Sequence, residues 1–236
     1  MSREQFYKDL PAYSSHPTTA TPGIGSFNQA YQRAFDEGAE AVLSIHISEA
    51  LSATVNVART AAAEFEGQNI QVIDSGQLSM GTGFQVELAG RLAKQGADVE
   101  QIQNELADLG KRTFVAAKLA SLEYLKRSGR MNPFMTGLAS MLSIVPILTM
   151  QSGNPGSERV RTTSKANARL LEMVEQCRPL ERIVLLHSNS GGALSEFAEL
   201  IPELVAEEKI VMANITPVIG VHVGPDAVGF AAVTKK

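Results

Sequence analysis

The hydroxyl side chains of one short segment are the best candidates in this sequence for binding an anionic group. Ser48, Ser52 and Thr54 follow an apolar, β-branched run at residues 41–47, which is typical of a buried strand. The alanine and valine residues after Thr54 predict a helix, whose first turn has free backbone N–H groups. Hydroxyls and N–H groups at a helix start can bind a carboxylate or a phosphate. The alternative is that Ser52 is only the N-cap of this helix.

Two arginines have the chemistry to bind a carboxylate or a phosphate. Arg130 follows Gly129 in a predicted turn, and Arg161 lies near Arg159 and Arg169 in the sequence. A planar guanidinium can donate two hydrogen bonds to either anion. The alternative for each is a solvated charge on the surface of a hairpin or a helix.

Of the four histidines, His222 is the candidate for a functional role. It lies in a glycine-rich turn that we expect to follow a strand, where its side chain can face a cleft. The alternative is a hydrogen-bonded structural histidine. We expect His46 and His187 to be structural and His16 to lie in an exposed loop. These dispersed histidines and the single cysteine lack the spacing of metal ligands, so we expect no metal.

A catalytic role is an alternative to simple binding. Asp74, His222 and Ser52 could be combined as a hydrolase triad, but the sequence has no G-x-S-x-G motif, and residues 188–192 (SNSGG) do not fit it. A phosphate-binding loop of the type G-x-x-x-x-G-K-[ST] is also absent from the sequence. We therefore assign no catalytic residue, and a lipid-acting hydrolase or phosphotransferase stays an alternative.

Segments typical of strands and of helices alternate along the chain and must position these residues. This alternation favours a parallel, three-layer α/β domain, and the pattern changes from Arg112 onward. The predicted strands are residues 41–47, 69–74, 114–117, 145–148, 182–187 and 209–213. The predicted helices are residues 2–10, 27–38, 80–95, 98–109, 133–144 and 191–204, with another that ends near residue 177.

The composition excludes several classes of protein. The chain has 236 residues, 44% of them apolar, and a mean hydropathy of -0.01, so it can bury one large core or two small ones. A net charge of -4 argues against binding to a nucleic-acid backbone. Cys177 is the only cysteine, no apolar run has the length of a membrane span, and the first residues lack a signal-peptide core. We therefore expect a cytoplasmic protein without integral membrane association.

Seven motifs carry a resemblance to a known family. Along the chain they are HPTTATP (16–22), ISEALSAT (47–54), IDS (73–75), LEYLKRSGRMNP (122–133), VPIL (145–148), ERVRT (158–162) and IGVHVGPDAVGF (219–230). In this order they resemble the DegV family of bacterial fatty-acid-binding proteins, over residues 6–229. The sequence departs from the family at Ala20, Thr21, Ser128, Val145 and Asp226, and the change at Ala20 and Thr21 removes a possible hydroxyl ligand.

The resemblance implies a fold and a function. It implies two α/β domains, residues 1–110 and 111–236, with a parallel sheet in the first, a mixed sheet in the second and a fatty-acid pocket between them. A DegV-like protein binds a long-chain fatty acid without any cofactor and presents its carboxylate to a separate kinase catalytic subunit, as part of phospholipid metabolism. The helix at residues 133–144 would supply apolar pocket walls or simply pack on the sheet.

The resemblance also implies roles for individual residues. Thr19 and Ser52 bind the fatty-acid carboxylate. Arg130 and His222 lie near the head group. Arg161 lies on the surface that faces the kinase, and His222 and Arg161 can support phosphoryl transfer rather than binding.

The chain departs most from the family at its beginning. In the family, a strand and an Asp-Ser-Thr loop precede the segment that corresponds to Gln5, Phe6 and Tyr7, and no such residues stand before them here. This difference implies a misplaced start or a truncated variant. A truncated homologue that no longer binds fatty acid is therefore a third alternative.

We predict that the 236-residue form is less stable, and aggregates more readily, than a form extended upstream by the family's opening strand. A buried strand contributes a row of hydrogen bonds and apolar packing on both faces, and the whole stability of a domain is only about 5–15 kcal/mol. The melting temperatures of both forms, with and without oleate, test this prediction. Equal melting temperatures and equal shifts with oleate would contradict it.

Overall fold

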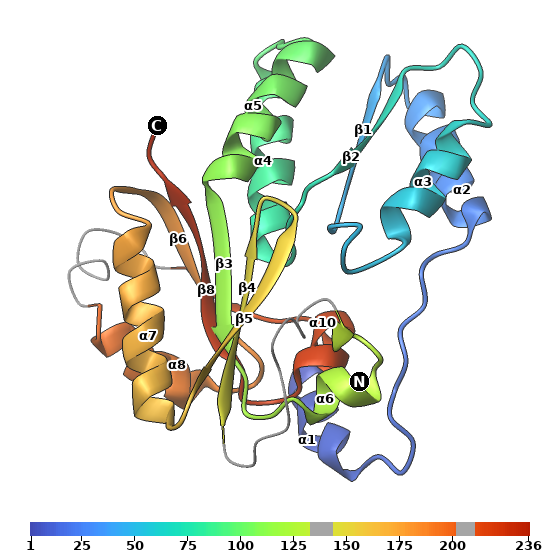
Figure 1. Ribbon diagram of the computed structural model, residues 1–236. Coiled ribbons are helices and arrows are strands. Elements are labelled where there is room, and N and C mark those ends of the chain that lie inside the picture. The colour runs from blue at the N-terminus through green and yellow to red at the C-terminus, as the bar shows by residue number, and fades with distance from the viewer. Residues whose placement is uncertain (133–143, 202–210) are drawn as a thin grey trace. The chain divides into compact units, whose positions relative to one another are not determined.

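The computed structural model describes residues 1–132, 144–201 and 211–236 (Figure 1). Its backbone divides into two compact units. The large unit consists of Met1–Thr19, Arg112–Met150 and Pro155–Lys236, and the small unit consists of Ala20–Lys111 and Gln151–Asn154. The predicted helix at residues 133–144 lies almost wholly outside the described residues. Among the described residues, no helix is both long enough and apolar enough to cross a membrane.

A six-stranded mixed sheet forms the centre of the large unit. Its strand order is β5-β4-β3-β8-β6-β7. Strand β8 pairs antiparallel with β3 and with β6, whereas β6 and β7 are parallel, which confirms the predicted mixed sheet. The strands are β3 (Thr113–Lys118), β4 (Val145–Gln151), β5 (Asn154–Val160), β6 (Leu180–His187), β7 (Val211–Asn214) and β8 (Val228–Thr234).

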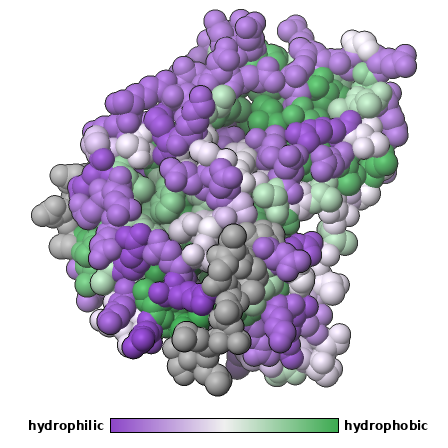
Figure 2. All heavy atoms as spheres, in the orientation of Figure 1, coloured by the Kyte–Doolittle hydropathy of each residue, from purple (hydrophilic) through white to green (hydrophobic). Residues whose placement is uncertain are grey.

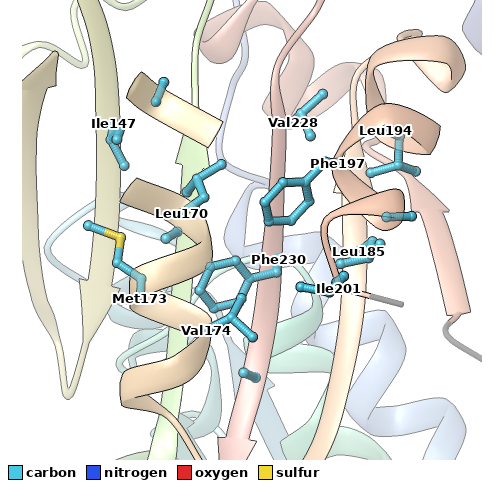
Figure 3. Close-up of a cluster of buried hydrophobic side chains, with 14 of the residues drawn as sticks. Ile147, Leu170, Met173, Val174, Leu185, Leu194, Phe197, Ile201, Val228 and Phe230 are labelled. Carbon is cyan, nitrogen blue, oxygen red and sulfur yellow. The ribbon is translucent and has the colours of Figure 1, made fainter. Parts of the chain in front are cut away.

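The main core lies where helices α7 (Thr163–Gln176) and α8 (Gly191–Glu199) pack on this sheet. Alternate side chains of a strand lie on the same face. Val228, Phe230 and Ala232 of β8 therefore all point toward the helices. Figure 3 shows Phe230 among side chains of α7, with Phe197 of α8 nearby. Every residue of β8 except the last is buried, so this strand is the central part of the core.

The first residues of the chain pack with its last third. Helix α1 (Arg3–Asp9) has Ser2 as its N-cap, as predicted, and the Ser2 Oγ accepts a hydrogen bond from the Gln5 N–H. The 3-10 helix η1 (Leu10–Ala12) follows. The Tyr7 hydroxyl donates to the Ile215 carbonyl over 2.8 Å, and Phe6 and Tyr7 are buried in one cluster with Leu10 and Val221. The predicted N-terminal domain, residues 1–110, includes these residues, whereas in the structure they belong to the large unit. The division of the chain at residue 110 stays a prediction.

The small unit is a three-layer arrangement around two parallel strands. Strand β1 (Val42–His46) pairs with β2 (Ile70–Asp74), which confirms the predicted parallel sheet. One face of the pair packs against α2 (Ile24–Asp36) and α3 (Thr54–Ala62). The other face packs against α4 (Met80–Lys94) and α5 (Val99–Arg112).

This small sheet is only partly covered. Every residue of β1 and β2 except Ser44 keeps some exposure to solvent, although parallel sheets are usually buried on both faces. A groove of about 1150 Å³ adjoins Leu43 and Ile45 of β1, Val86 and Ala89 of α4, and Ile102 of α5. Figure 2 shows hydrophobic atoms exposed over this unit, in the upper part of the view. The small unit therefore has an apolar face that its own described residues do not fill.

We predict opposite effects on stability for the same substitution at two glycines. A Cβ at Gly229 in β8 would lie within 2.6 Å of the Ala117 Cα and closer still to the Ala116 carbonyl oxygen, so the strands must move apart. Gly229→Ala should lower the free energy of unfolding by about 2–4 kcal/mol. Gly90 lies inside α4 with open space around it, so Gly90→Ala should raise it by about 0.5–1 kcal/mol. Urea unfolding of both variants measures the difference, and a Gly229→Ala protein as stable as the wild type would contradict the prediction.

Candidate functional site

A threonine and a histidine from opposite ends of the chain meet at the last turn of helix α10 (Pro217–Val223). The Thr19 Oγ1 lies 3.2 Å from the His222 Nε2. The prediction that His222 lies in a turn after a strand is wrong, because residues 217–223 are helical. Pro217 suits the first helical turn, and Gly224, with a φ of 75°, ends the helix.

The surroundings of His222 keep its imidazole neutral. Burial lowers the pKa of His222 to about 4, and the charges of Arg130 and His16 add to this effect. The His222 Nδ1 is buried and has no hydrogen-bond partner among the described residues. A neutral imidazole with one free ring nitrogen can donate a hydrogen bond to a ligand or accept one.

Arg130 is positioned by the way helix α6 (Glu123–Arg127) ends. The Gly129 N–H donates to the Lys126 carbonyl and the Arg130 N–H donates to the Leu125 carbonyl, which is the Schellman pattern. This pattern needs a left-handed residue, and Gly129 has a φ of 70°. Gly129 therefore fixes the backbone at Arg130. The half-buried Arg130 guanidinium lowers the pKa of His222 through its charge.

His16 belongs to the same cluster, although we expected an exposed loop. It is half-buried, and its Nε2 lies 3.0 Å from the Val221 carbonyl oxygen. Its ring centroid lies 6.0 Å from that of Tyr124. No local pattern at residues 14–19 indicates this position, because the partner carbonyl lies 205 residues away.

Ser52 lies in the small unit, and among the described residues its hydroxyl contacts its near neighbour Thr54. Its Oγ lies 2.8 Å from the Thr54 Oγ1 and accepts a hydrogen bond from the Thr54 N–H over 3.3 Å. Ala53, not Ser52, is the N-cap residue of α3. The alternative that Ser52 is the N-cap is therefore wrong by one residue. The Ser52 Oγ nevertheless accepts a hydrogen bond from the first N–H of the helix. Its place beside the fatty-acid carboxylate stays a prediction.

Arg161 is exposed between β5 and α7 and, among the described residues, forms no hydrogen bond or salt bridge. Its neighbour Thr162 is the N-cap of α7 and accepts from the Lys165 N–H. Arg169, by contrast, is engaged by Glu158 at 2.7 Å and by Glu172 at 2.9 Å. Arg161 is thus the member of this arginine group that is available to a partner.

Two members of the hydrolase triad that we considered, Asp74 and Ser52, have hydrogen-bond partners within the small unit. The Asp74 carboxylate accepts hydrogen bonds from the backbone N–H groups of Glu49 and Gly76, and Ser52 is bonded to Thr54. Among the described residues, the serine hydroxyl that contacts a histidine ring is that of Ser44, which lies 2.7 Å from His46 but is only 9% exposed. In the described parts of the chain, no group of three or more His, Cys, Asp or Glu residues could hold a metal ion.

Comparisons with known proteins place the chain in a family. A model of the DegV family, described as "Uncharacterised protein, DegV family", matches residues 1–235. The chain is 32% identical to a DegV domain-containing protein of Halalkalibacterium halodurans, over 100% of this chain and 85% of the relative.

Two solved structures extend the likeness to the fold. A DegV family protein from Thermus thermophilus, described by its fatty acid binding, is 31% identical with a TM-score of 0.88, over 100% of this chain and 85% of that one. DegV from Bacillus subtilis, described as a fatty acid binding protein, is 28% identical with a TM-score of 0.84, over 98% and 84%. With motifs, fold and sequence in agreement along its whole length, the chain belongs to the DegV family.

Proposed function

We propose that this protein binds a long-chain fatty acid, with the carboxylate at Thr19, Arg130 and His222 and with Ser52 as a further hydroxyl donor. The observation that carries the proposal is the contact of Thr19 with a neutral His222 beside the charge of Arg130. The relatives from Thermus thermophilus and Bacillus subtilis are described as binding fatty acids, which supports the choice of ligand.

The chemistry of the three side chains suits a carboxylate. Arg130 supplies a permanent positive charge, and the Thr19 hydroxyl can rotate to donate a hydrogen bond to an oxygen. A neutral His222 can add a donor without placing a second buried charge next to Arg130. The carboxylate in turn stabilises the protonated imidazole, so ligand binding should raise the pKa of His222.

We also propose that the bound fatty acid is the substrate of a separate kinase. A carboxylate oxygen attacks the γ-phosphorus of ATP held by the kinase, and an acyl phosphate forms as ADP leaves. This chain contributes the substrate and a docking surface, not the nucleotide site. The exposed Arg161 is our candidate for the contact with the kinase, because a free guanidinium can pair with a carboxylate or a phosphate of the partner.

Removal of either hydroxyl should weaken fatty-acid binding. Thr19→Val and Ser52→Ala should each cost about 1–3 kcal/mol of binding free energy, the scale of a hydrogen bond to a charged group. Calorimetry with oleate measures the effect. Thr60→Val and Ser195→Ala are matched controls, because these hydroxyls donate to backbone carbonyls of exposed helix turns. Unchanged affinity in both test variants would show that the carboxylate is bound elsewhere.

Arg161→Ala should separate phosphoryl transfer from binding. We expect unchanged affinity for oleate and a rate of acyl-phosphate formation that is lower by about tenfold or more, because a charge-assisted contact with the kinase is lost. ADP release with the kinase catalytic subunit measures transfer, and Arg33→Ala, at an exposed helix position, is the control. His222→Ala should lower transfer too and should also bind oleate more weakly, because its imidazole belongs to the proposed carboxylate site. Transfer at the wild-type rate in both variants would remove these residues from the mechanism.

A further inference from the structure

Two residues of one short loop contact two consecutive residues of α10. His16 reaches the Val221 carbonyl, and Thr19 reaches the His222 side chain. Pro17 lies between them and limits the backbone conformations of the loop. The loop at residues 16–19 is therefore held at both ends against the helix turn that carries His222.

The Val221 carbonyl needs a donor from outside its helix. In a continuing helix it would accept from the N–H of residue 225, but that residue is a proline and has no N–H. The helix also ends at Gly224, whose N–H donates to the Gly220 carbonyl instead. Val221 is buried, and a buried carbonyl without a partner is costly. The His16 Nε2–H fills this role.

The same contact identifies the nitrogen of the His16 ring that donates a hydrogen bond. A carbonyl oxygen can only accept, so the His16 Nε2 must carry a proton. The Nδ1 is buried and has no hydrogen-bond partner among the described residues. The ring also packs near Tyr124, which in turn covers Gly224 so closely that a Cβ there would collide with it. His16 is thus one part of a rigid set of contacts around the end of α10.

We propose that His16 is a positioning residue of the carboxylate site, because its Nε2–H anchors the loop to the Val221 carbonyl and so holds the Thr19 hydroxyl against His222. This inference rests on the proposed function of the site, but the geometry it describes exists in the ligand-free protein. Loss of the anchor leaves the Val221 carbonyl unpaired and frees Thr19, three residues away, to leave His222.

Three substitutions of His16 test the donor itself. His16→Gln has an amide N–H at about the reach of Nε2, so it should keep the anchor. His16→Asn is shorter, and His16→Leu has no donor. Two measurements are made on each protein: its affinity for oleate, and the ¹⁵N signals of the His222 ring without ligand. We expect His16→Leu and His16→Asn to bind about tenfold more weakly, the scale of losing the Thr19 hydrogen bond to the carboxylate, with shifted His222 signals, and His16→Gln to resemble the wild type.

His187 provides the control for these substitutions. His187→Leu removes another half-buried imidazole, whose Nδ1 accepts the Ser190 N–H, and should leave the His222 signals unchanged. Wild-type affinity and signals in both His16→Leu and His16→Asn would overturn the inference. So would equal damage in His16→Gln and His16→Asn, a comparison that holds even if His16→Leu does not fold. Failure of the wild type to bind oleate would overturn the proposed function alone, because the ring signals of the ligand-free protein still test the role of His16.

Discussion

The burial of strand β8 is the constraint on which the rest of the large unit depends. The strand pairs on both sides, packs under α7 and α8, and approaches the neighbouring backbone so closely at Gly229 that no side chain fits there. The buried Ser188 at the end of β6 extends this constraint: its hydroxyl donates to the Gly224 carbonyl over 2.7 Å and accepts the Ala227 N–H over 2.8 Å. The end of α10, and with it His222, is therefore fixed by the sheet.

The candidate site is a product of long-range packing. The segments that carry Thr19, Arg130 and His222 are far apart in the chain. Thr19 lies on a loop held by the long-range contact of His16, Arg130 follows a glycine-terminated helix, and His222 lies in a helix that ends before a proline. These contacts fix the backbone from which each of the three side chains extends. That is a suitable basis for recognising a small charged group, which needs donors at defined positions.

The sequence predicted the regular elements better than the site. Strands such as β1 and β2 were evident because β-branched runs stand between helical segments. Residues 217–223 were misjudged because an apolar run with a central glycine fits both a strand and a helix at this length. His16 was missed because its partner is a backbone carbonyl, whose need for a donor arises only once Pro225 is seen to follow a helix. The family motifs pointed to Thr19 and His222, but only the structure showed them in contact.

The position of β8 in the middle of its sheet also affects how the protein can be made. A chain leaves the ribosome with its N-terminal end first. Strands β3 and β6 therefore emerge before β8, the strand that must lie between them. Helix α1 is synthesised well before Ile215 and Val221, the residues against which it packs. Nearly all of the small unit, in contrast, is one continuous segment, Ala20–Lys111, which can fold while synthesis continues. The apolar surface that β8 covers in the large unit therefore stays exposed until residues 228–234 have been made.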